Sequence, residues 1–414
     1  MGARHAPAIL TGRFVRVLAR LRKPGGGSAM PGLIVNKIAP GFLASALASF
    51  PHGLVIVTGS SGKSTTTKML VAVLEAHGLR TFTNPSTANI TQGLTSALLE
   101  RASLTGRVDA DIAVLEMDEG HGALIAPRLT PRIVVLTNVM TDQIDRFHDS
   151  EKVLEYLATI ARRATGVVVT NGDDAMLEEL AASLDVDVRR FGVASAVLES
   201  QRRGLGYTRT TPTRIGAGAV VTGTVARTAT IDLDGHELAL ALPARGVHYA
   251  VDAAAAISAA SAILGDRFDP DVVVSTFGAL EPVFARGEVT EVRGVPVEFV
   301  LVQNPASYQL NVEALDPGLD QILFAMGSDV RDPGYFWPVD VGRLGRVRVV
   351  SGSKAHELAL HLAYHDVAID RIEPDVPTAL EAFFALPEPT SGIKTILFTA
   401  ESMRRTRAHL GLKS

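Results

Sequence analysis

The sequence contains no cysteine among its 414 residues. This absence excludes disulfide bonds, zinc–thiolate sites and cysteine nucleophiles together. The chain also has little excess charge, −4 at pH 7, which gives no reason to expect a nucleic-acid partner. Hydrophobic residues make up 47% of the chain, so it can bury a sizeable core, and its length predicts two or three domains.

Long apolar runs are missing as well. The best candidate for a membrane span, residues 33–50, is interrupted by Lys37 and Pro40. The N-terminus is basic, but it lacks the long apolar core and the cleavage site of a secretory signal. We therefore expect a cytoplasmic protein with no transmembrane segment. Arginines alternate with Val and Leu over residues 13–22, which predicts an amphipathic helix. This helix is either an ordinary solvated surface helix or a contact for anionic lipid headgroups.

The chain divides into three parts. Residues 1–50 hold the basic helix and a lead-in segment, residues 51–280 form a central domain, and residues 281–414 form a smaller C-terminal domain. In the central domain, short apolar runs alternate with stretches of helical periodicity, which predicts a doubly wound parallel α/β sheet. The expected strands are 54–59, 111–119, 132–138 and 166–174, and the expected helices are 63–78, 91–102 and 150–164.

The composition changes over residues about 195–240, where Thr, Gly and β-branched residues dominate. They predict antiparallel ribbons inserted in or appended to the sheet. Residues 251–264 are plainly helical. After about residue 285 the strand and helix alternation resumes and predicts a second, smaller α/β domain, with strands in 295–304, 321–329, 346–352, 366–373 and 393–400.

A candidate phosphate-binding loop lies in VIVTGSSGKSTTTKML, residues 55–70. An apolar strand leads into Gly-Ser-Ser-Gly-Lys-Ser and then into a helix, so backbone N–H groups can cradle phosphate. Lys63 can bridge phosphate oxygens, and the Ser64 hydroxyl can hold Mg²⁺. The first glycine, Gly59, stands two residues closer to Gly62 than in G-x-x-x-x-G-K-[ST], which makes an ordinary P-loop kinase a poor fit.

Acidic residues follow two of the expected strands. Glu116 and Asp118 lie in the run LEMDE, which ends an expected strand. Carboxylates beside a phosphate loop usually organise Mg²⁺. The alternative is that they are solvated loop acids. Asn138, Asp142 and Asp145 follow the next strand. Asp142 could support a second Mg²⁺ or orient an acceptor carboxylate, and helix capping is the competing explanation.

These motifs resemble the Mur ligases, ATP-dependent amide-bond synthetases of peptidoglycan. The shared features are the short loop G-x-x-G-K-S-T, the strand-end Glu116 and the pattern N-x-x-x-D-Q-x-D at 138–145. Gln143 stands where most of the family has histidine, and this is similar to the branch formed by the MurT subunit of lipid II isoglutaminyl synthase. The resemblance continues through residues 242–260, 284–288, 301–305, 327–340 and 349–364.

The resemblance implies a Mur-ligase-like central P-loop ATPase domain on a parallel sheet, and a Rossmann-like C-terminal domain. ATP would phosphorylate a carboxylate, and an amine would then attack the acyl phosphate. The catalytic residues implied are Lys63, Glu116 and Asp329, and the implied Mg²⁺ ligands are Ser64, Glu116 and Asp142. The implied ATP-binding residues are Gly59, Ser60, Ser61, Gly62, Lys63, Ser64, Thr65, Asn138, Asp252 and Arg286, of which Asp252 stands where the family usually has asparagine.

In the MurT branch the acceptor is the α-carboxylate of D-glutamate in the stem peptide of lipid II. The nucleophile is ammonia from the glutamine amidotransferase partner GatD. A chain without cysteine cannot hydrolyse glutamine by the usual thiol route, so a GatD-like partner is expected. Asp329 would orient or deprotonate ammonia; Asp332 and Asp340 are its rivals, and capping of a turn is the alternative role. Residues 154–161 contain no lysine, whereas amino-acid-adding Mur ligases carry a carbamylated lysine there.

The sequence also departs from the branch. Many MurT proteins carry a four-cysteine zinc ribbon that this chain lacks, so no zinc is expected. Gln303 replaces a lysine, and DPGYF interrupts the aspartate motif. Two other interpretations stay open: a stand-alone Mur-like ligase that joins an amino acid to another acid, or an ATP-binding scaffold without catalysis.

Overall fold

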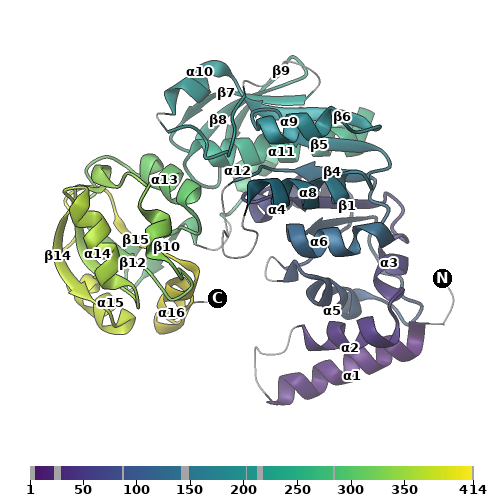
Figure 1. Ribbon diagram of the computed structural model, residues 1–414, viewed down its shortest axis with the longest axis horizontal. Helices are drawn as coiled ribbons and strands as arrows, with labels where there is room; N and C mark the ends of the chain where they lie inside the picture. The colour runs from purple at the N-terminus through teal and green to yellow at the C-terminus, as the bar shows by residue number, and fades with distance from the viewer. Residues whose placement is uncertain are drawn as a thin grey trace.

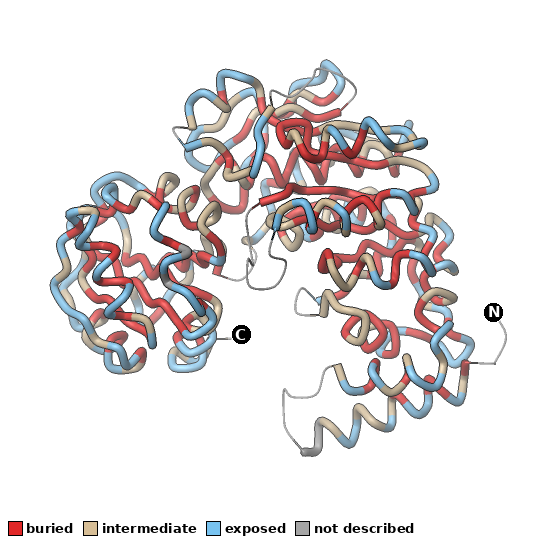
Figure 2. Tube along the Cα trace, in the orientation of Figure 1, coloured by how far each residue is buried: buried red, intermediate tan, exposed pale blue. Residues whose placement is uncertain are grey.

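The computed structural model describes residues 5–22, 29–85, 88–140, 149–201, 203–211, 218–282 and 285–412. These residues fold into two units, each built around one β-sheet, and the N-terminal helices form a layer at one end of the larger unit (Figure 1). The buried segments form a separate core in each unit (Figure 2).

The central sheet has nine strands within the described residues, in the order β2-β3-β1-β4-β5-β6-β7-β8-β9. Pairing is parallel from β2 to β7 and antiparallel from β7 to β9. The strands are β1 (Leu54–Thr58), β2 (Thr81–Phe82), β3 (Ile112–Glu116), β4 (Ile133–Leu136), β5 (Val167–Asn171), β6 (Asp187–Val193), β7 (Gly218–Val225), β8 (Thr228–Leu233) and β9 (His236–Ala241).

The strand order reverses at β1, which pairs with β3 on one side and with β4 on the other. In a doubly wound sheet the loops diverge at such a point and leave room for a ligand beyond the carboxyl ends of the strands. The expected strands, helices and parallel sheet of this domain are confirmed. The segment predicted as antiparallel ribbons adds β7, β8 and β9 to the edge of the same sheet.

Helices cover both faces of the central sheet, which explains why its inner strands are apolar throughout. Val55 and Val57 of β1 point into one core, and Leu54 and Ile56 point into the other. The first core is covered by α4 (Lys63–Ala76), α11 (Val247–Leu264) and α12 (Pro270–Ala279); the second by α5 (Thr91–Arg101), α6 (Glu119–Ile125), α8 (Ser150–Ala161) and α9 (Ala175–Ala181). Shorter helices are η3 (Ala126–Arg128), α10 (Ser195–Ser200) and η4 (Gly265–Arg267).

One helix in the described part of the chain, Val247–Arg267, is long and apolar enough to cross a membrane by composition. However, 83% of its apolar window is buried inside the protein. The helix α11 is therefore a core helix, and its many alanines let it lie close to α4 and to the central strands.

The N-terminal layer consists of α1 (Ala6–Arg22), α2 (Met30–Ile38) and α3 (Phe42–Leu47). It packs on α5. The Arg13 guanidinium donates to the carbonyl oxygen of Leu99 at 3.2 Å and to that of Ala102, at the end of α5, and Arg16 pairs with Glu100. The predicted basic helix thus exists and is fixed to the central domain on one of its sides.

The C-terminal sheet has six strands among the described residues, in the order β10-β11-β15-β12-β13-β14, and all of its pairs are parallel except β10 with β11. Its strands are β10 (Arg286–Val292), β11 (Val295–Leu301), β12 (Ile322–Ala325), β13 (Arg346–Ser351), β14 (Ala368–Glu373) and β15 (Lys394–Phe398). Its helices are α13 (Pro305–Ala314), η5 (Pro333–Phe336), η6 (Gly342–Leu344), α14 (Ala355–Tyr364), α15 (Val376–Phe384) and α16 (Ala400–His409).

Ion pairs connect the two units. Arg245, just before α11, pairs with Glu298 of β11 at 3.2 Å and with Asp316. Arg203 pairs with Asp340 at 2.9 Å. Because Glu298 is almost fully buried, loss of Arg245 would leave an uncompensated charge in the interface. These contacts hold the C-terminal unit against the carboxyl ends of the central strands.

Candidate active site

A cavity of about 490 Å³ lies between the two units, a size that suits a nucleotide or another small ligand. The central domain contributes the loop from Ser60 to Thr65, the ends of β3 and β4, and the first turns of α11. The C-terminal domain contributes the start of β10, the start of α13, and residues that follow β12 and β15. Its polar lining includes Glu116, Asn138, Asp252, Arg286 and Asp329.

The phosphate loop has the backbone shape that its two glycines predict. Gly59 has φ of +132°, and a Cβ there would lie 2.2 Å from Thr137 Oγ1. Gly62 has φ of +82° and begins α4 with no side chain capping the helix. The first N–H groups of α4 are therefore left for a ligand, and a helix N-terminus favours an anion. This cradle fits the phosphates of ATP.

Asn138 holds the loop in place. Its backbone oxygen accepts from Ser60 N at 3.0 Å, and its side-chain oxygen accepts from Ser61 N at 2.9 Å. Its Nδ2 donates to Ser61 O at 3.2 Å, and Ser60 Oγ accepts from Met140 N at 3.1 Å. With its amide engaged in this way, Asn138 orients the phosphate loop from the end of β4.

Lys63 forms an ion pair that the sequence did not predict. Its Nζ donates to Glu119 Oε1 at 2.8 Å, to Ser60 O at 3.2 Å and to Gly59 O. Burial acts to lower the pKa of Lys63, but Glu119, helped by Glu116 and Asp118, outweighs burial and raises it. The lysine is therefore charged at neutral pH. Glu119 is the last acid of LEMDE, and the spacing alone did not show which of its acids reaches the lysine.

Glu116 ends β3 in a fixed position. Its backbone N donates to Asn84 Oδ1 and its backbone O accepts from Asn84 Nδ2, both at 3.0 Å. Burial raises the pKa of the Glu116 carboxyl, while Ser64, Lys63 and the other neighbours act to lower it. The carboxylate thus faces the hydroxyl of Ser64 at the start of α4.

The oxygen donors around Ser64 fit Mg²⁺. Glu116 and Ser64 face each other, and Glu119 Oε2 is buried with no hydrogen-bond partner in the described part of the chain. Hard oxygen donors of this kind suit Mg²⁺. No group of three or more His, Asp or Glu side chains converges as a metal site among the described residues. The third predicted ligand, Asp142, lies outside the residues that the structure describes.

Arg286 reaches the cleft from the C-terminal domain. It starts β10, its guanidinium donates to Gln303 Oε1 at 3.4 Å, and it is close enough to act on the pKa of Glu116 and Asp252. The turn before β10 is fixed by Glu288, whose Oε2 accepts from Ala285 N and from Arg407, both at 2.7 Å. The domain interface thus places a cation opposite the phosphate loop.

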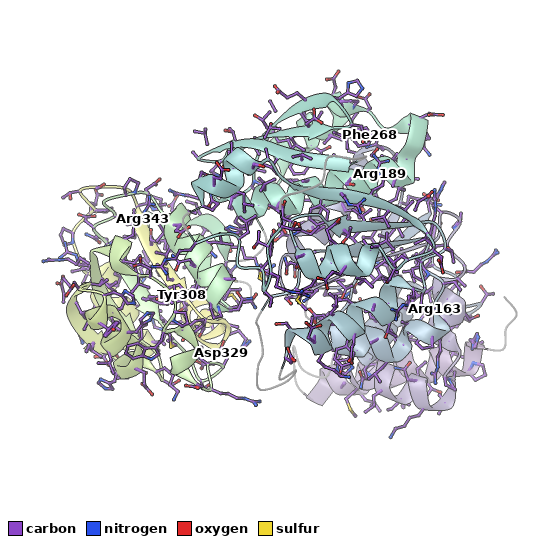
Figure 3. The ribbon with its side chains drawn as sticks, turned by 45° about the horizontal axis from the view of Figure 1, so that its top comes forward. Arg163, Arg189, Phe268, Tyr308, Asp329 and Arg343 are labelled. Carbon is purple, nitrogen blue, oxygen red and sulfur yellow. The ribbon has the colours of Figure 1, made fainter. Side chains whose placement is uncertain are left out.

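Asp329 lies on the C-terminal wall of the cleft (Figure 3), while its two rivals do not line it. Its Oδ1 accepts from Thr399 Oγ1 at 2.8 Å. Asp332 instead caps η5 through Gly334 N at 2.9 Å, and Asp340 pairs with Arg203. Of the three aspartates, the structure therefore brings Asp329 to the site.

A second carboxylate, Glu401, lies beside Asp329. A Cβ built on Gly327 would be 2.4 Å from Glu401 Oε2 and 2.8 Å from Asp329 Oδ1, so both oxygens face the same small space. Glu401 Oε2 is buried and has no hydrogen-bond partner among the residues described. No sequence pattern pointed to Glu401, because it follows β15 whereas Asp329 follows β12. These strands are neighbours only in the folded sheet.

Comparison with known proteins agrees with this architecture. Residues 57–260 match the family model of the Mur ligase middle domain. The central domain is a Mur ligase middle domain. It is 26% identical to the MurT subunit of lipid II isoglutaminyl synthase (glutamine-hydrolyzing) from Streptococcus pneumoniae, over 82% of this chain and 81% of that protein. It is 28% identical to the Staphylococcus aureus MurT subunit, over 45% of this chain and 41% of that protein.

The fold is that of solved Mur ligases. The MurF ligase of Thermotoga maritima in complex with ADP superposes with a TM-score of 0.65 at 20% identity, over 89% of this chain and 81% of that one. The expected fold class and the resemblance to Mur ligases of the MurT branch are thus confirmed.

In this Mur ligase middle domain, Asp252 lies directly over the phosphate loop. Its Oδ1 is 2.2 Å from the position that a Cβ on Gly62 would take, and the side chain is almost fully buried. Burial raises the pKa of the Asp252 carboxyl to about 8, although Arg286 and the hydroxyls of Thr65 and Thr66 act to lower it. The carboxyl is therefore mostly neutral at pH 7 and adds little repulsion to a bound polyphosphate.

We predict that ATP binding weakens as pH rises through about 8, because Asp252 then ionises beside the phosphate loop. The dissociation constant of ATP should rise roughly tenfold between about pH 7 and pH 9 in the unmodified protein, as measured by calorimetry. In Asp252→Asn it should stay nearly constant. Glu237→Gln, an exposed change on β9, is the control and should keep the original dependence. An unchanged pH dependence in Asp252→Asn would show that another group titrates.

Proposed function

We propose that this chain is the ATP-dependent carbon–nitrogen ligase subunit of an amidating enzyme. It activates a carboxylate as an acyl phosphate and converts it to an amide with ammonia. By its similarity to MurT, the acceptor is the α-carboxylate of D-glutamate in the lipid II stem peptide. The observation that carries the proposal is the cleft between the two units, in which a phosphate cradle from one domain faces Asp329 from the other.

The central domain serves the activation half of the reaction. Backbone N–H groups at the start of α4 and the ammonium of Lys63 hold the phosphates of ATP, and Arg286 adds a positive charge from the opposite wall. Ser64 and Glu116 would hold Mg²⁺, which neutralises phosphate charge. Phosphoryl transfer needs positioning and charge neutralisation more than covalent help from the protein, and these residues supply both.

Asp329 and Glu401 act in the second step, in which ammonia attacks the acyl phosphate. Ammonia attacks the acyl carbon, the bond to phosphate breaks, and the attacking nitrogen must lose a proton. Asp329, oriented by the hydroxyl of Thr399, is placed to accept that proton. Glu401, whose Oε1 lies 3.9 Å from Arg405 Nε, places its Oε2 beside Asp329. Two neighbouring carboxylates favour a small cation such as ammonium over an anionic competitor.

Ammonia has to come from elsewhere, because a chain without cysteine lacks the thiol that glutamine amidotransferases use. We therefore propose a GatD-like glutamine amidotransferase as partner, in keeping with the naming of MurT as a subunit. Because ATP and glutamine are cytoplasmic, the proposed reaction takes place on the cytoplasmic side of the membrane.

The test measures ADP formation and amide product by the purified chain with ATP, Mg²⁺ and lipid II. Ammonium chloride should support both, and glutamine should support neither until a GatD-like amidotransferase is added. If L-alanine replaces ammonium as the productive nucleophile, the chain is a stand-alone amino-acid ligase instead. If ATP binds but no nucleophile leads to ADP, the chain is a non-catalytic scaffold.

A further inference from the structure

The first helix exposes four of its large apolar side chains. Its inner face is formed by Ala8, Ile9 and Gly12, which are buried against the neighbouring helices. A solvated surface helix buries its apolar stripe and exposes polar residues, whereas α1 carries apolar residues on its exposed face as well. Its exposed apolar residues are Leu10, Phe14, Val17 and Leu18, and they recur at the spacing of one helix face.

The next helix extends this pattern. Met30, Leu33 and Ile38 of α2 are also large, apolar and exposed, and Lys37 stands among them. The two helices pack against each other at the outer edge of the molecule (Figure 1). Exposed apolar residues gathered in this way mark a binding surface, whereas single ones scattered over a surface need no explanation. We call these seven side chains the N-terminal apolar surface.

The charge of this region indicates what covers the surface. Residues 1–50 carry seven Lys or Arg and no Asp or Glu. The remaining 364 residues carry 33 Lys or Arg against 44 Asp or Glu, so the N-terminal region has an excess of positive charge that the rest of the chain lacks. Such asymmetry suits an anionic surface. A helix with an apolar face and basic residues lies in the headgroup region of a bilayer.

We propose that the N-terminal apolar surface binds the headgroup region of an anionic phospholipid bilayer. Leu10, Phe14 and their neighbours enter the boundary between headgroups and acyl chains, and the basic residues of the region attract anionic lipid. The attachment is peripheral. It goes beyond the proposed ligase activity, since it needs neither nucleotide nor acceptor.

The surface is connected rigidly to the active site. Helices α1 and α2 pack on α5, and Arg13 binds two carbonyl oxygens at the end of α5. Helix α5 starts at Thr91, two residues after Asn89, which lines the cleft. A bilayer bound at α1 therefore has a fixed orientation relative to the cleft, as an enzyme that acts on a lipid-linked acceptor requires.

The test is co-sedimentation of the full chain with vesicles of phosphatidylcholine, with or without phosphatidylglycerol. We expect binding to the anionic vesicles and little to the neutral ones, with loss of binding when salt is raised from about 0.15 M to about 1 M. Phe14→Asp should weaken binding by at least about tenfold, because it removes an aromatic ring that enters the bilayer and adds a negative charge. The milder double variant Leu10→Ser with Phe14→Ser should act in the same direction.

The control is Leu360→Asp on α14, whose side chain is as exposed as that of Phe14, 61% against 63%. It should bind vesicles as the unmodified chain does, and all variants should keep ATP affinity, which reports an intact cleft. Equal binding by Phe14→Asp and the unmodified chain, or no preference for anionic vesicles, would overturn the proposal. A dimer in solution that Phe14→Asp converts to monomer, without vesicle binding, would assign the surface to a second copy. Since the vesicles contain no peptidoglycan precursor, none of these outcomes depends on the ligase activity.

Discussion

Replacing Lys63 with methionine should reduce ADP formation by about 10² to 10³-fold. The ammonium is held at the phosphate loop, and its raised pKa keeps it charged throughout the neutral range. Methionine fills a similar volume but leaves the developing charge on the transferred phosphoryl group without this cation. The measurement is steady-state ADP release with lipid II and ammonium present.

The ion pair with Glu119 complicates this variant, because Lys63→Met leaves a buried carboxylate without its partner. Breaking a buried pair in this way destabilises a protein by about 3–5 kcal/mol, so the single variant could lose activity through unfolding. The double variant Lys63→Met with Glu119→Gln removes both charges and should recover most of the melting temperature.

The double variant decides between the two roles of the lysine. Glu119→Gln alone is measured beside it, because Glu119 also lies among the oxygen donors near Ser64. If Lys63 acts on phosphate, the double variant stays far less active than Glu119→Gln although it is folded; if the lysine serves only to neutralise Glu119, the double variant reaches the activity of Glu119→Gln. Lys68→Met is the matched control on the same helix. Among the described residues its Nζ donates to the backbone oxygens of Glu281 and Pro282, outside the cleft, so ADP formation should stay near that of the unmodified protein.

The central sheet was predictable because its strands are buried on both faces and read as short apolar runs. The strand β6 was missed, since Asp187, Arg189 and Arg190 break the apolar pattern that identifies a buried strand. Its partners β5 and β7 stabilise it through backbone hydrogen bonds, which depend on no particular side chain. Long-range pairing of this kind has no local signature.

The two halves of the site differ in how far the sequence predicts them, and the reason is similar. The phosphate loop is one continuous segment, so glycine spacing and the adjoining strand predict it together. The run LEMDE pointed to Glu116 and Asp118 but not to Glu119. Which acid reaches Lys63 depends on where α6 begins: Asp118 caps the helix through His121 N at 3.1 Å, and Glu119 in its first turn reaches Lys63. Neighbours that come from distant segments, as Glu401 does, are brought together only by the order of strands in the C-terminal sheet.

Replacing Asp329 with asparagine should reduce amide formation from ammonium by about 10² to 10⁴-fold, the range expected when a general base is lost. The change keeps the size of the side chain and its acceptance of the Thr399 hydroxyl. The dissociation constant of ATP should not change, because the proposed phosphate contacts come from the phosphate loop and Arg286 and not from Asp329. Product formation by single-turnover assay, beside ATP binding by calorimetry, separates the two effects.

Variants of the neighbouring acids test the role of Asp329 further. Asp332→Asn, three residues away and outside the cleft, should leave product formation nearly unchanged. Glu401→Gln should raise the KM for ammonium more than it lowers kcat, because this carboxylate adds negative charge at the ammonia position without receiving the proton. If Asp329→Asn forms product at the normal rate while Glu401→Gln does not, the two acids have exchanged roles and Glu401 is the base. If neither variant affects the reaction, the nucleophile enters elsewhere, and the acid pair only fixes the ends of β12 and β15.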